Sequence, residues 1–265
     1  MSGSALTRLN ERSLVRLSDA LRSGLLKTPF SRLTLSRLVP IEFLDSIVED
    51  LRQHESQGLT SSLLLVLVEA LLQQRTELLS ENPQLELVMT GPEPPGSFTR
   101  DTGVVVRQMF TNATHSIFLC GFAVYQGKEI FSALAKRMQA VPAMNVSMCL
   151  NIERPHGDHT PSEVLVARFR KRFRETQWPD NVDLPEIFFD PRTLEDSGSG
   201  KSACLHAKFV IADQQQVFLS SANFTEAAQQ RNIEAGVRTD NAALARDLST
   251  HFQSLIDNGD LKKLP

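Results

Sequence analysis

Two segments of the sequence combine residue types that could carry out chemistry on a phosphate. The segment HAKFVIAD contains His206, Lys208 and Asp213, and SSAN contains Ser221 and Asn223. Because alternate residues of a strand point to the same face, His206 and Lys208 share a face, and so do Ser221 and Asn223. An imidazole, an ammonium, a hydroxyl and a carboxamide in one patch suit a tetrahedral phosphate diester better than a planar carbonyl.

Whether these groups form one patch depends on how the two segments pair. With a turn at 214–215, antiparallel pairing sets His206 opposite Asn223 and Lys208 opposite Ser221. The turn contains no Asn-Gly signal, and a shift of one residue would turn half of the groups away. On this register, the sequence predicts that all four side chains converge on one face of a hairpin.

Each residue type suggests a role at a phosphodiester. His206 can attack phosphorus, because imidazole also leaves readily and a phosphohistidine divides the reaction into two easier steps. The second ring nitrogen needs an acceptor, and Glu234 in the strand-like segment NIEAGV is the candidate. Lys208, Ser221 and Asn223 are expected to bind the phosphate oxygens. Asp213 lies about 20 Å from His206 along an extended strand, which favours a role in turn or core structure.

These segments resemble the phospholipase D superfamily signature, which is HxKx4D, then GSxN, then a downstream glutamate. Ser220 stands where the superfamily has glycine. The surrounding sequence, including AVYQGKEIF, LPEIFFDPRTLE and SANFTEAAQQRNIEAGV, is similar over most of the chain to a family of DISARM antiphage-defence proteins. The resemblance implies metal-independent phosphodiester cleavage, a bacterial defence setting and other DISARM components as partners. It also implies one motif made of His206, Lys208, Asp213, Ser221, Asn223 and Glu234.

The chain contains one such motif, whereas superfamily enzymes generally combine two. In the paired arrangement one histidine attacks and the other protonates the leaving oxygen. A second HxK is absent, because the remaining histidines are followed two residues later by Ser, Ile, Asp, Pro and Gln; they are His54, His115, His156, His159 and His251. An isologous dimer would bring His206 to its counterpart. We therefore predict a homodimer with one composite active site.

The hydrophobic pattern divides the chain into two parts. The first third has apolar residues at helical spacing, with helices expected over 11–24, 40–58 and 61–79. The third of these is apolar nearly all round and is expected to be the buried one. Beyond it, strand-like and helical segments alternate, which predicts parallel strands covered by helices. We expect an α/β fold, a phospholipase D-like mixed sheet flanked by helices over 83–265, preceded by an all-helical module over 1–82.

Composition limits the class of protein. The chain has 265 residues, 41% of them hydrophobic, and a net charge of −3, so affinity for a polyanion must come from local patches. The longest apolar run, LLLVLVEALL, is about half of a bilayer span, and a signal segment is lacking, so we expect a cytoplasmic protein. The cysteines show no CxxC spacing, which fits reduced thiols, and no metal site or cofactor is expected.

One local cationic patch is present in ARFRKRFRETQW. Arg168, Lys171 and Arg172 are candidates for binding a nucleic-acid backbone. The alternative is a solvated face whose arginine stems cover apolar surface. Lys201 in GSGKS is a further candidate for a phosphate contact. That segment is not a P-loop, because Glu195 occupies the position of the first glycine and a strand follows.

The sequence therefore predicts a metal-independent phosphodiesterase, in particular a nuclease that acts through a phosphohistidine intermediate. Two alternatives stay open. A phospholipase is disfavoured by the absence of a convincing exposed amphipathic membrane face. A non-catalytic subunit that binds nucleic acid or a protein partner in a defence complex is favoured by the single motif and by the altered Ser220.

Overall fold

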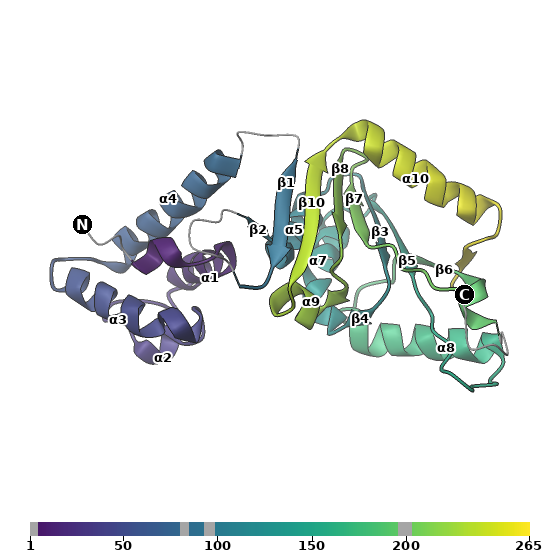
Figure 1. The fold of residues 1–265 in the computed structure, drawn as a ribbon, viewed down its shortest axis with the longest axis horizontal. Helices are drawn as coiled ribbons and strands as arrows, with labels where there is room; N and C mark the ends of the chain where they lie inside the picture. Colours follow the sequence, from purple (N-terminus) through teal and green to yellow (C-terminus); the bar gives the residue numbers. More distant parts are fainter. Residues whose placement is uncertain (1–4, 80–84, 93–98, 196–202) are drawn as a thin grey trace. The chain divides into compact units, whose positions relative to one another are not determined.

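A computed structural model describes residues 5–79, 85–92, 99–195 and 203–265 (Figure 1). The chain forms two compact units. The first comprises Met1–Pro83 and Pro92–Asp101, and the second comprises Gln84–Gly91 and Thr102–Pro265. Residues 92–101 therefore belong to the first unit, although they follow a strand of the second unit in the sequence. We propose that the second unit contains the catalytic site.

The first unit is helical. Its helices are η1 (Ala5–Arg8), α1 (Glu11–Arg22), α2 (Arg32–Leu35), α3 (Ile41–Glu55) and α4 (Ser61–Leu79). They enclose a leucine-rich core in which Leu14 and Leu17 are fully buried. The short segment β2 (Arg100–Asp101) is tied to α1 by an ion pair from Arg100 Nε to Glu11 Oε1 at 2.7 Å. Both partners are nearly buried, so removing either one would leave an uncompensated charge.

Helix α4 is more exposed than its composition indicates. Leu63, Val66 and Leu67 are 53%, 62% and 49% exposed, whereas Leu64 and Val68 are buried. The prediction that this helix is the buried one of the module is therefore wrong. The enclosed helix is α1, in which only Arg16, Asp19 and Arg22 are exposed, whereas α4 buries a single face. Of the helices in the described part of the chain, none is long and apolar enough to span a membrane.

The second unit is built on a mixed sheet with the order β11-β6-β5-β3-β7-β8-β10-β1. Its strands are β1 (Glu86–Thr90), β3 (Ser116–Gly121), β5 (Asn145–Leu150), β6 (Glu186–Phe189), β7 (Phe209–Ala212), β8 (Gln216–Ser220), β10 (Glu234–Asp240) and β11 (Lys262–Lys263). The central strands β3, β5 and β6 are parallel, as the alternating pattern predicts. Strand β1 runs in the same direction as these three, but it is not their neighbour, because it pairs antiparallel with β10. Three strands separate β1 from β3, so no direct crossover joins them as parallel neighbours.

Helices cover both faces of this sheet (Figure 1). They are α5 (Thr102–Asn112), α6 (Gly127–Ile130), α7 (Ser132–Ala140), α8 (Ser162–Arg172), α9 (Glu226–Gln230) and α10 (Ala242–Asp257), with short turns η2 (Phe173–Gln177) and η3 (Pro191–Leu194). Alternate residues of β7 enter different cores. Val210 joins the core with residues of α5, α7 and α8, whereas Phe209 joins the core with Phe252 of α10.

A second, small sheet interrupts the strand-like segment 116–125. Chain pairing in β3 stops at Gly121, and β4 (Val124–Tyr125) pairs in parallel with β9 (Phe224–Thr225). A Cβ atom on Gly121 would lie 2.5 Å from the Phe224 ring, so only glycine allows this approach. The break turns the chain at Phe122 and brings it beside the segment that follows β8.

Candidate active site

The hairpin that carries the motif differs by one residue from our prediction. A three-residue turn, 213–215, joins β7 to β8, in place of a two-residue turn at 214–215. The pairing moves with it, and the Ser220 N–H donates to the Lys208 carbonyl oxygen at 3.2 Å. The predicted register, which set Lys208 opposite Ser221, is therefore wrong.

The turn begins early because of what the Asp213 carboxylate binds. It accepts hydrogen bonds from the backbone N–H groups of Thr114 at 2.8 Å, His115 at 2.7 Å and Ser116 at 2.9 Å. Burial raises the pKa of Asp213, but the hydrogen bonds from these three residues together outweigh it, so the pKa lies below its ordinary value. Because Asp213 is seven residues from His206 along the hairpin, we infer that it anchors the hairpin to β3 and does not contact substrate.

His206 and Lys208, in the segment that leads into β7, are in direct contact. Lys208 Nζ lies 3.1 Å from His206 Nδ1 and 3.3 Å from Nε2, and it donates to the His206 carbonyl oxygen at 2.8 Å. The Phe122 ring supports both side chains. Its centroid is 4.8 Å from that of the imidazole and 5.7 Å from Lys208 Nζ, which allows a cation–π attraction. Phe122 was not among the residues that we predicted.

Ser221 and Glu234 form a second contact beside the first. Ser221 Oγ donates to Glu234 Oε2 at 2.5 Å, and Asn232 Nδ2 donates to Glu234 Oε1 at 3.2 Å. Both carboxylate oxygens are thus occupied, and no hydrogen bond joins Glu234 to His206 within the described residues. We predicted that Glu234 orients the imidazole; in this structure it orients the Ser221 hydroxyl.

Lys208 connects the two pairs electrostatically. Desolvation by burial lowers the pKa of Lys208, and attraction to Glu234 opposes this shift without cancelling it. The ammonium therefore lies within the field of the Glu234 carboxylate while it touches the His206 ring. A cation in this position can bind a non-bridging phosphate oxygen next to the attacking nitrogen.

Asn223 reaches the same region through the small sheet. The Phe224 N–H donates to the Ala123 carbonyl oxygen at 3.1 Å, so Asn223 lies beside the chain that follows Phe122. Among the residues described, Asn223 Oδ1 is a buried atom with no hydrogen-bond partner. A buried polar group without a partner costs free energy, and an amide can rotate to present either its donor or its acceptor. Asn223 is therefore suited to receive a polar group of a ligand.

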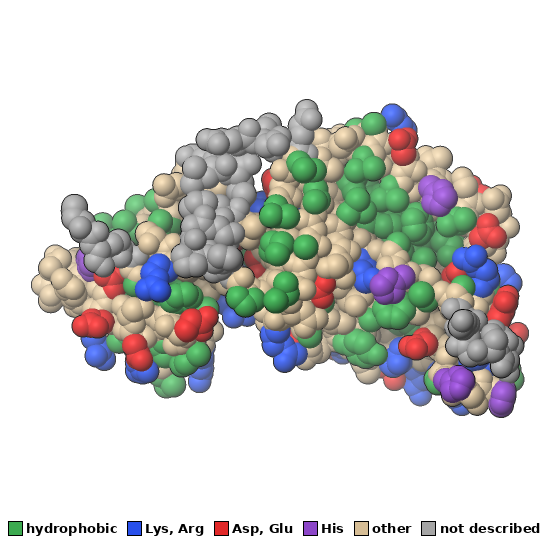
Figure 2. All heavy atoms as spheres, viewed as in Figure 1, with side chains coloured by type: hydrophobic (Ala, Val, Ile, Leu, Met, Phe, Trp, Pro, Cys, Tyr) green, Lys and Arg blue, Asp and Glu red, His purple; other side chains and the backbone are tan. Residues whose placement is uncertain are grey.

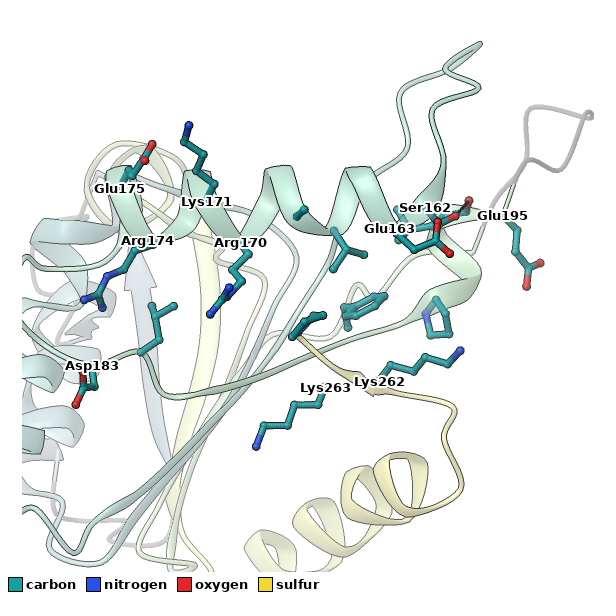
Figure 3. Close-up of a pocket in the computed structure, with 17 residues that line it drawn as sticks. Ser162, Glu163, Arg170, Lys171, Arg174, Glu175, Asp183, Glu195, Lys262 and Lys263 are labelled. Atoms are coloured by element: carbon teal, nitrogen blue, oxygen red, sulfur yellow. Dashed lines mark hydrogen bonds between the residues drawn. The ribbon is translucent and has the colours of Figure 1, made fainter.

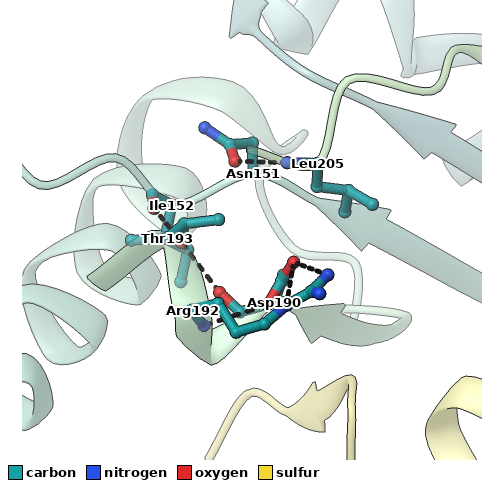
Figure 4. Close-up of polar contacts among 6 residues, drawn as sticks. All are labelled: Asn151, Ile152, Asp190, Arg192, Thr193 and Leu205. Atoms are coloured by element: carbon teal, nitrogen blue, oxygen red, sulfur yellow. Dashed lines mark hydrogen bonds and ion pairs between the residues drawn. The ribbon is translucent and has the colours of Figure 1, made fainter. Parts of the chain in front are cut away.

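Asn151 supports the motif from the end of β5, and the sequence reasoning missed it. Its Oδ1 accepts a hydrogen bond from the Leu205 N–H at 3.0 Å, which fixes the backbone directly before His206 (Figure 4). Thr193 Oγ1 donates to the carbonyl oxygen of the next residue, Ile152, at 2.6 Å. The signal that could have identified Asn151 is its place at the carboxyl end of a parallel strand, where sites of α/β proteins assemble.

We expect Asn151→Leu to reduce phosphodiester hydrolysis by roughly tenfold to a hundredfold, because a displaced backbone misplaces the nucleophile. The lost acceptor also leaves the Leu205 N–H unsatisfied, at a cost of about 1–3 kcal/mol in unfolding free energy. Steady-state hydrolysis and urea unfolding measure the two effects. Asn151→Asp keeps the acceptor oxygen and should restore most of the rate. Equal rates for the leucine variant and the unmodified chain would contradict this role.

The cations of α8 point in different directions. Of the three predicted nucleic-acid contacts, Lys171 lines a groove beside the helix (Figure 3), whereas Arg168 and Arg172 do not. The Arg172 guanidinium instead lies 5.8 Å from the centre of the Phe169 ring, as in the alternative of arginines that cover apolar surface. Lys201 lies outside the described residues.

The two buried cysteines, Cys120 and Cys149, are core residues. Burial raises the pKa of Cys149 to about 12 and that of Cys120 further, so both thiols stay protonated and pack in the core. Within the described ranges, no three His, Cys, Asp or Glu side chains gather in a way that would hold a metal ion.

Comparison with protein families places the chain. The family model described as cardiolipin synthase, PLD-like domain, matches residues 106–256, which is more than half of the sequence. This chain belongs to the PLD-like family. The matched range contains every member of the candidate site, from Phe122 to Glu234. The resemblance that the motif residues suggested is thereby confirmed.

Individual relatives are more distant. This PLD-like chain is 27% identical to the DISARM protein DrmC of Bacillus paralicheniformis over 158 residues, which cover 59% of the chain and 57% of DrmC. Among solved structures it is similar to NucT from Helicobacter pylori, with 16% identity, a TM-score of 0.42 and coverage of 58% and 86% of the two chains. It is also similar to Nuc from Salmonella typhimurium, a phospholipase D family member, with 18% identity, a TM-score of 0.42 and coverage of 69% and 98%.

Proposed function

We propose that this PLD-like chain is a metal-independent phosphodiesterase, and specifically a nuclease that uses His206 as its nucleophile. The observation that carries the proposal is the contact between the Lys208 ammonium and the His206 imidazole beside the Ser221–Glu234 pair. It supports the proposal because a cation that can bind phosphate contacts the imidazole, and because Lys208 is attracted to Glu234, the partner of the Ser221 hydroxyl. Membership of the PLD-like family supports action on a phosphodiester at the general level.

The proposed reaction has two steps. A ring nitrogen of His206 attacks phosphorus, the bond from phosphorus to the leaving oxygen breaks, and a general acid gives that oxygen a proton. Water then attacks the phosphohistidine and returns the imidazole. Lys208 and the Asn223 amide bind the non-bridging oxygens, whose charge grows in the transition state, and Glu234 holds the Ser221 hydroxyl in place.

The general acid is proposed to be His206 of a second chain, which makes the enzyme a homodimer. Light scattering should then report a mass near 59 kDa, twice the 29.5 kDa of one chain. Dilution that dissociates the dimer should reduce the specific activity, since each composite site needs both imidazoles. A strictly monomeric species with full activity would contradict the composite site and require an acid from within the chain.

Similarity to a DISARM protein is the reason for proposing a role in antiphage defence, in a complex with other components of such a system. A second candidate is a non-catalytic subunit that binds nucleic acid or a partner. Ser220 favours it, because this side chain replaces the family glycine and its Oγ already accepts the Ala222 N–H at 2.9 Å. A phospholipase is the third candidate.

One assay separates these candidates. The isolated protein is incubated in EDTA with bis(p-nitrophenyl) phosphate, with single- and double-stranded DNA and RNA, and with phosphatidylcholine vesicles. Hydrolysis of the generic ester and of a nucleic acid supports the nuclease. Release of headgroup alone supports the phospholipase, and nucleic-acid binding without hydrolysis supports the non-catalytic subunit.

A further inference from the structure

A large groove lies on the second unit at a different place from the motif. It runs between α8 and the carboxyl-terminal strand β11, and its volume is about 970 Å³. His206, Lys208, Ser221 and Glu234 do not line it. This volume is at the upper end of the range for small-molecule sites. The groove is thus large enough for a ligand and is distinct from the proposed catalytic centre.

Cations from two distant parts of the sequence border the groove. Arg170 of α8 and Arg174 of η2 extend toward it, and β11 contributes Lys262 and Lys263 (Figure 3). Arg174 donates to the Val182 carbonyl oxygen, and Lys263 forms an ion pair within its own sheet. Among the described residues, the side chains of Arg170 and Lys262 have no hydrogen-bond or ion-pair partner. These two cations are therefore free to bind an anion.

The floor of the groove is apolar. Val166, Phe189 and Leu194 line the groove and are nearly buried, and Leu184 and Pro265 also line it. An apolar floor favours the binding of a ligand that covers it with a flat, weakly hydrated surface, because both surfaces are removed from water. A ligand that consists only of charged groups would leave this surface unused.

Carboxylates occupy the ends of the groove. Glu163 and Glu195 lie near one end, on the same side as Lys262, and Asp183 lies near Arg174 (Figure 3). Acids at the ends disfavour a uniformly anionic ligand such as a polyphosphate. They favour a ligand that carries an anion at one point and hydrogen-bond donors at another.

We propose that the groove binds a nucleotide unit. Its phosphate pairs with Arg170, its base covers the apolar floor, and its sugar hydroxyls or exocyclic amino groups donate to Glu163 or Glu195. The inference rests on the proposed nuclease function, which supplies such units as parts of the substrate or as products. A free nucleotide and a nucleotide within a single strand share this chemistry.

Binding to the full chain tests the proposal by calorimetry with dAMP and deoxyribose 5-phosphate, and by fluorescence anisotropy with labelled dT12. Arg170→Ala should weaken binding of dAMP or of dT12 by roughly tenfold, the effect of losing one charge-assisted hydrogen bond. Lys262→Ala should also weaken the binding of the same probe. Lys136→Ala is the matched control, because it removes an exposed cation of α7 that does not line the groove, and it should change binding by less than about twofold.

Each result has one reading. Binding of dAMP identifies a free nucleotide as the ligand, and binding of dT12 alone identifies a strand. Equal losses of binding in the Lys136→Ala and Arg170→Ala variants would overturn the groove as the binding site and favour a diffuse cationic surface. Binding of deoxyribose 5-phosphate as tightly as dAMP, or no binding of any probe, would also overturn it. Hydrolysis of bis(p-nitrophenyl) phosphate reports separately on the proposed catalytic function, because that substrate needs only the motif.

Discussion

His206→Ala is expected to lower the rate of phosphodiester hydrolysis by roughly ten-thousandfold or more, since removing a nucleophile removes the covalent route. His206→Asn should do the same, although it keeps a polar side chain of intermediate size. The imidazole is exposed, so neither substitution opens a cavity, and the unfolding free energy should change by less than about 0.5 kcal/mol. Initial rates in EDTA and urea unfolding measure the two quantities.

A covalent intermediate gives this prediction a second readout. Quenching the reaction of the unmodified protein and a ³²P-labelled substrate in alkaline detergent should leave label on the protein, and later acid treatment should release it, as the P–N bond of a phosphoramidate requires. The His206 variants should carry no label. Hydrolysis that continues at the original rate in both variants would eliminate His206 as the nucleophile. If the unmodified protein carries label on His206 but releases no product, the second step, hydrolysis of the phosphohistidine, would be the step that fails.

Asp213→Ala is expected to cause the largest loss of stability among substitutions in the motif. The carboxylate satisfies three backbone N–H groups at the start of β3, and Asp213 itself has a φ of 53°, which alanine tolerates poorly. The expected loss in unfolding free energy is about 1–3 kcal/mol, allowing for water that replaces part of the lost bonding. Asp213→Asn keeps an acceptor oxygen and tolerance for this φ, so it should lose less.

The pH dependence of stability should follow from the same contacts. The folded-state pKa of Asp213 lies below its unfolded value, so the folded state favours the ionised form. Its contribution is complete above the ordinary aspartate pKa of about 3.9 and is lost as the pH falls through the folded-state pKa. Urea unfolding at pH 7 and below pH 3 should therefore show a smaller difference between the Asp213→Ala and unmodified proteins at the acid pH. Loss of activity in Asp213→Asn without loss of stability would contradict a purely structural role.

Local sequence was sufficient to predict the chemistry-bearing residues but not their register. His206 and Lys208 meet as expected, although both lie in the segment just before β7. The residue at which the turn begins depends on a distant contact, because the partners of the Asp213 carboxylate lie almost one hundred positions earlier in the chain. Hydrophobic pattern and turn propensity contain no information on that contact, so the pairing moved by one position.

The residues that the sequence did not reveal share a cause. Phe122, Asn151 and Lys262 each act beside residues that are remote in sequence, and no motif spacing connects them. The exposure of helix α4 could not be predicted for a related reason, since the composition of a helix does not show how many other helices surround it. Parallel β3, β5 and β6 were predictable because each strand is followed by its own covering helix or turn, which is a local pattern.

The distribution of thiols has a practical consequence for following the reaction. Cys120 and Cys149 are buried and stay protonated, whereas Cys204 is exposed and lies two residues before His206. Alkylating reagents attack exposed thiolates far faster than buried thiols. A fluorophore coupled through maleimide chemistry should therefore attach at a single position without any engineered cysteine. Its emission would then report the arrival and departure of material at the proposed nucleophile in real time.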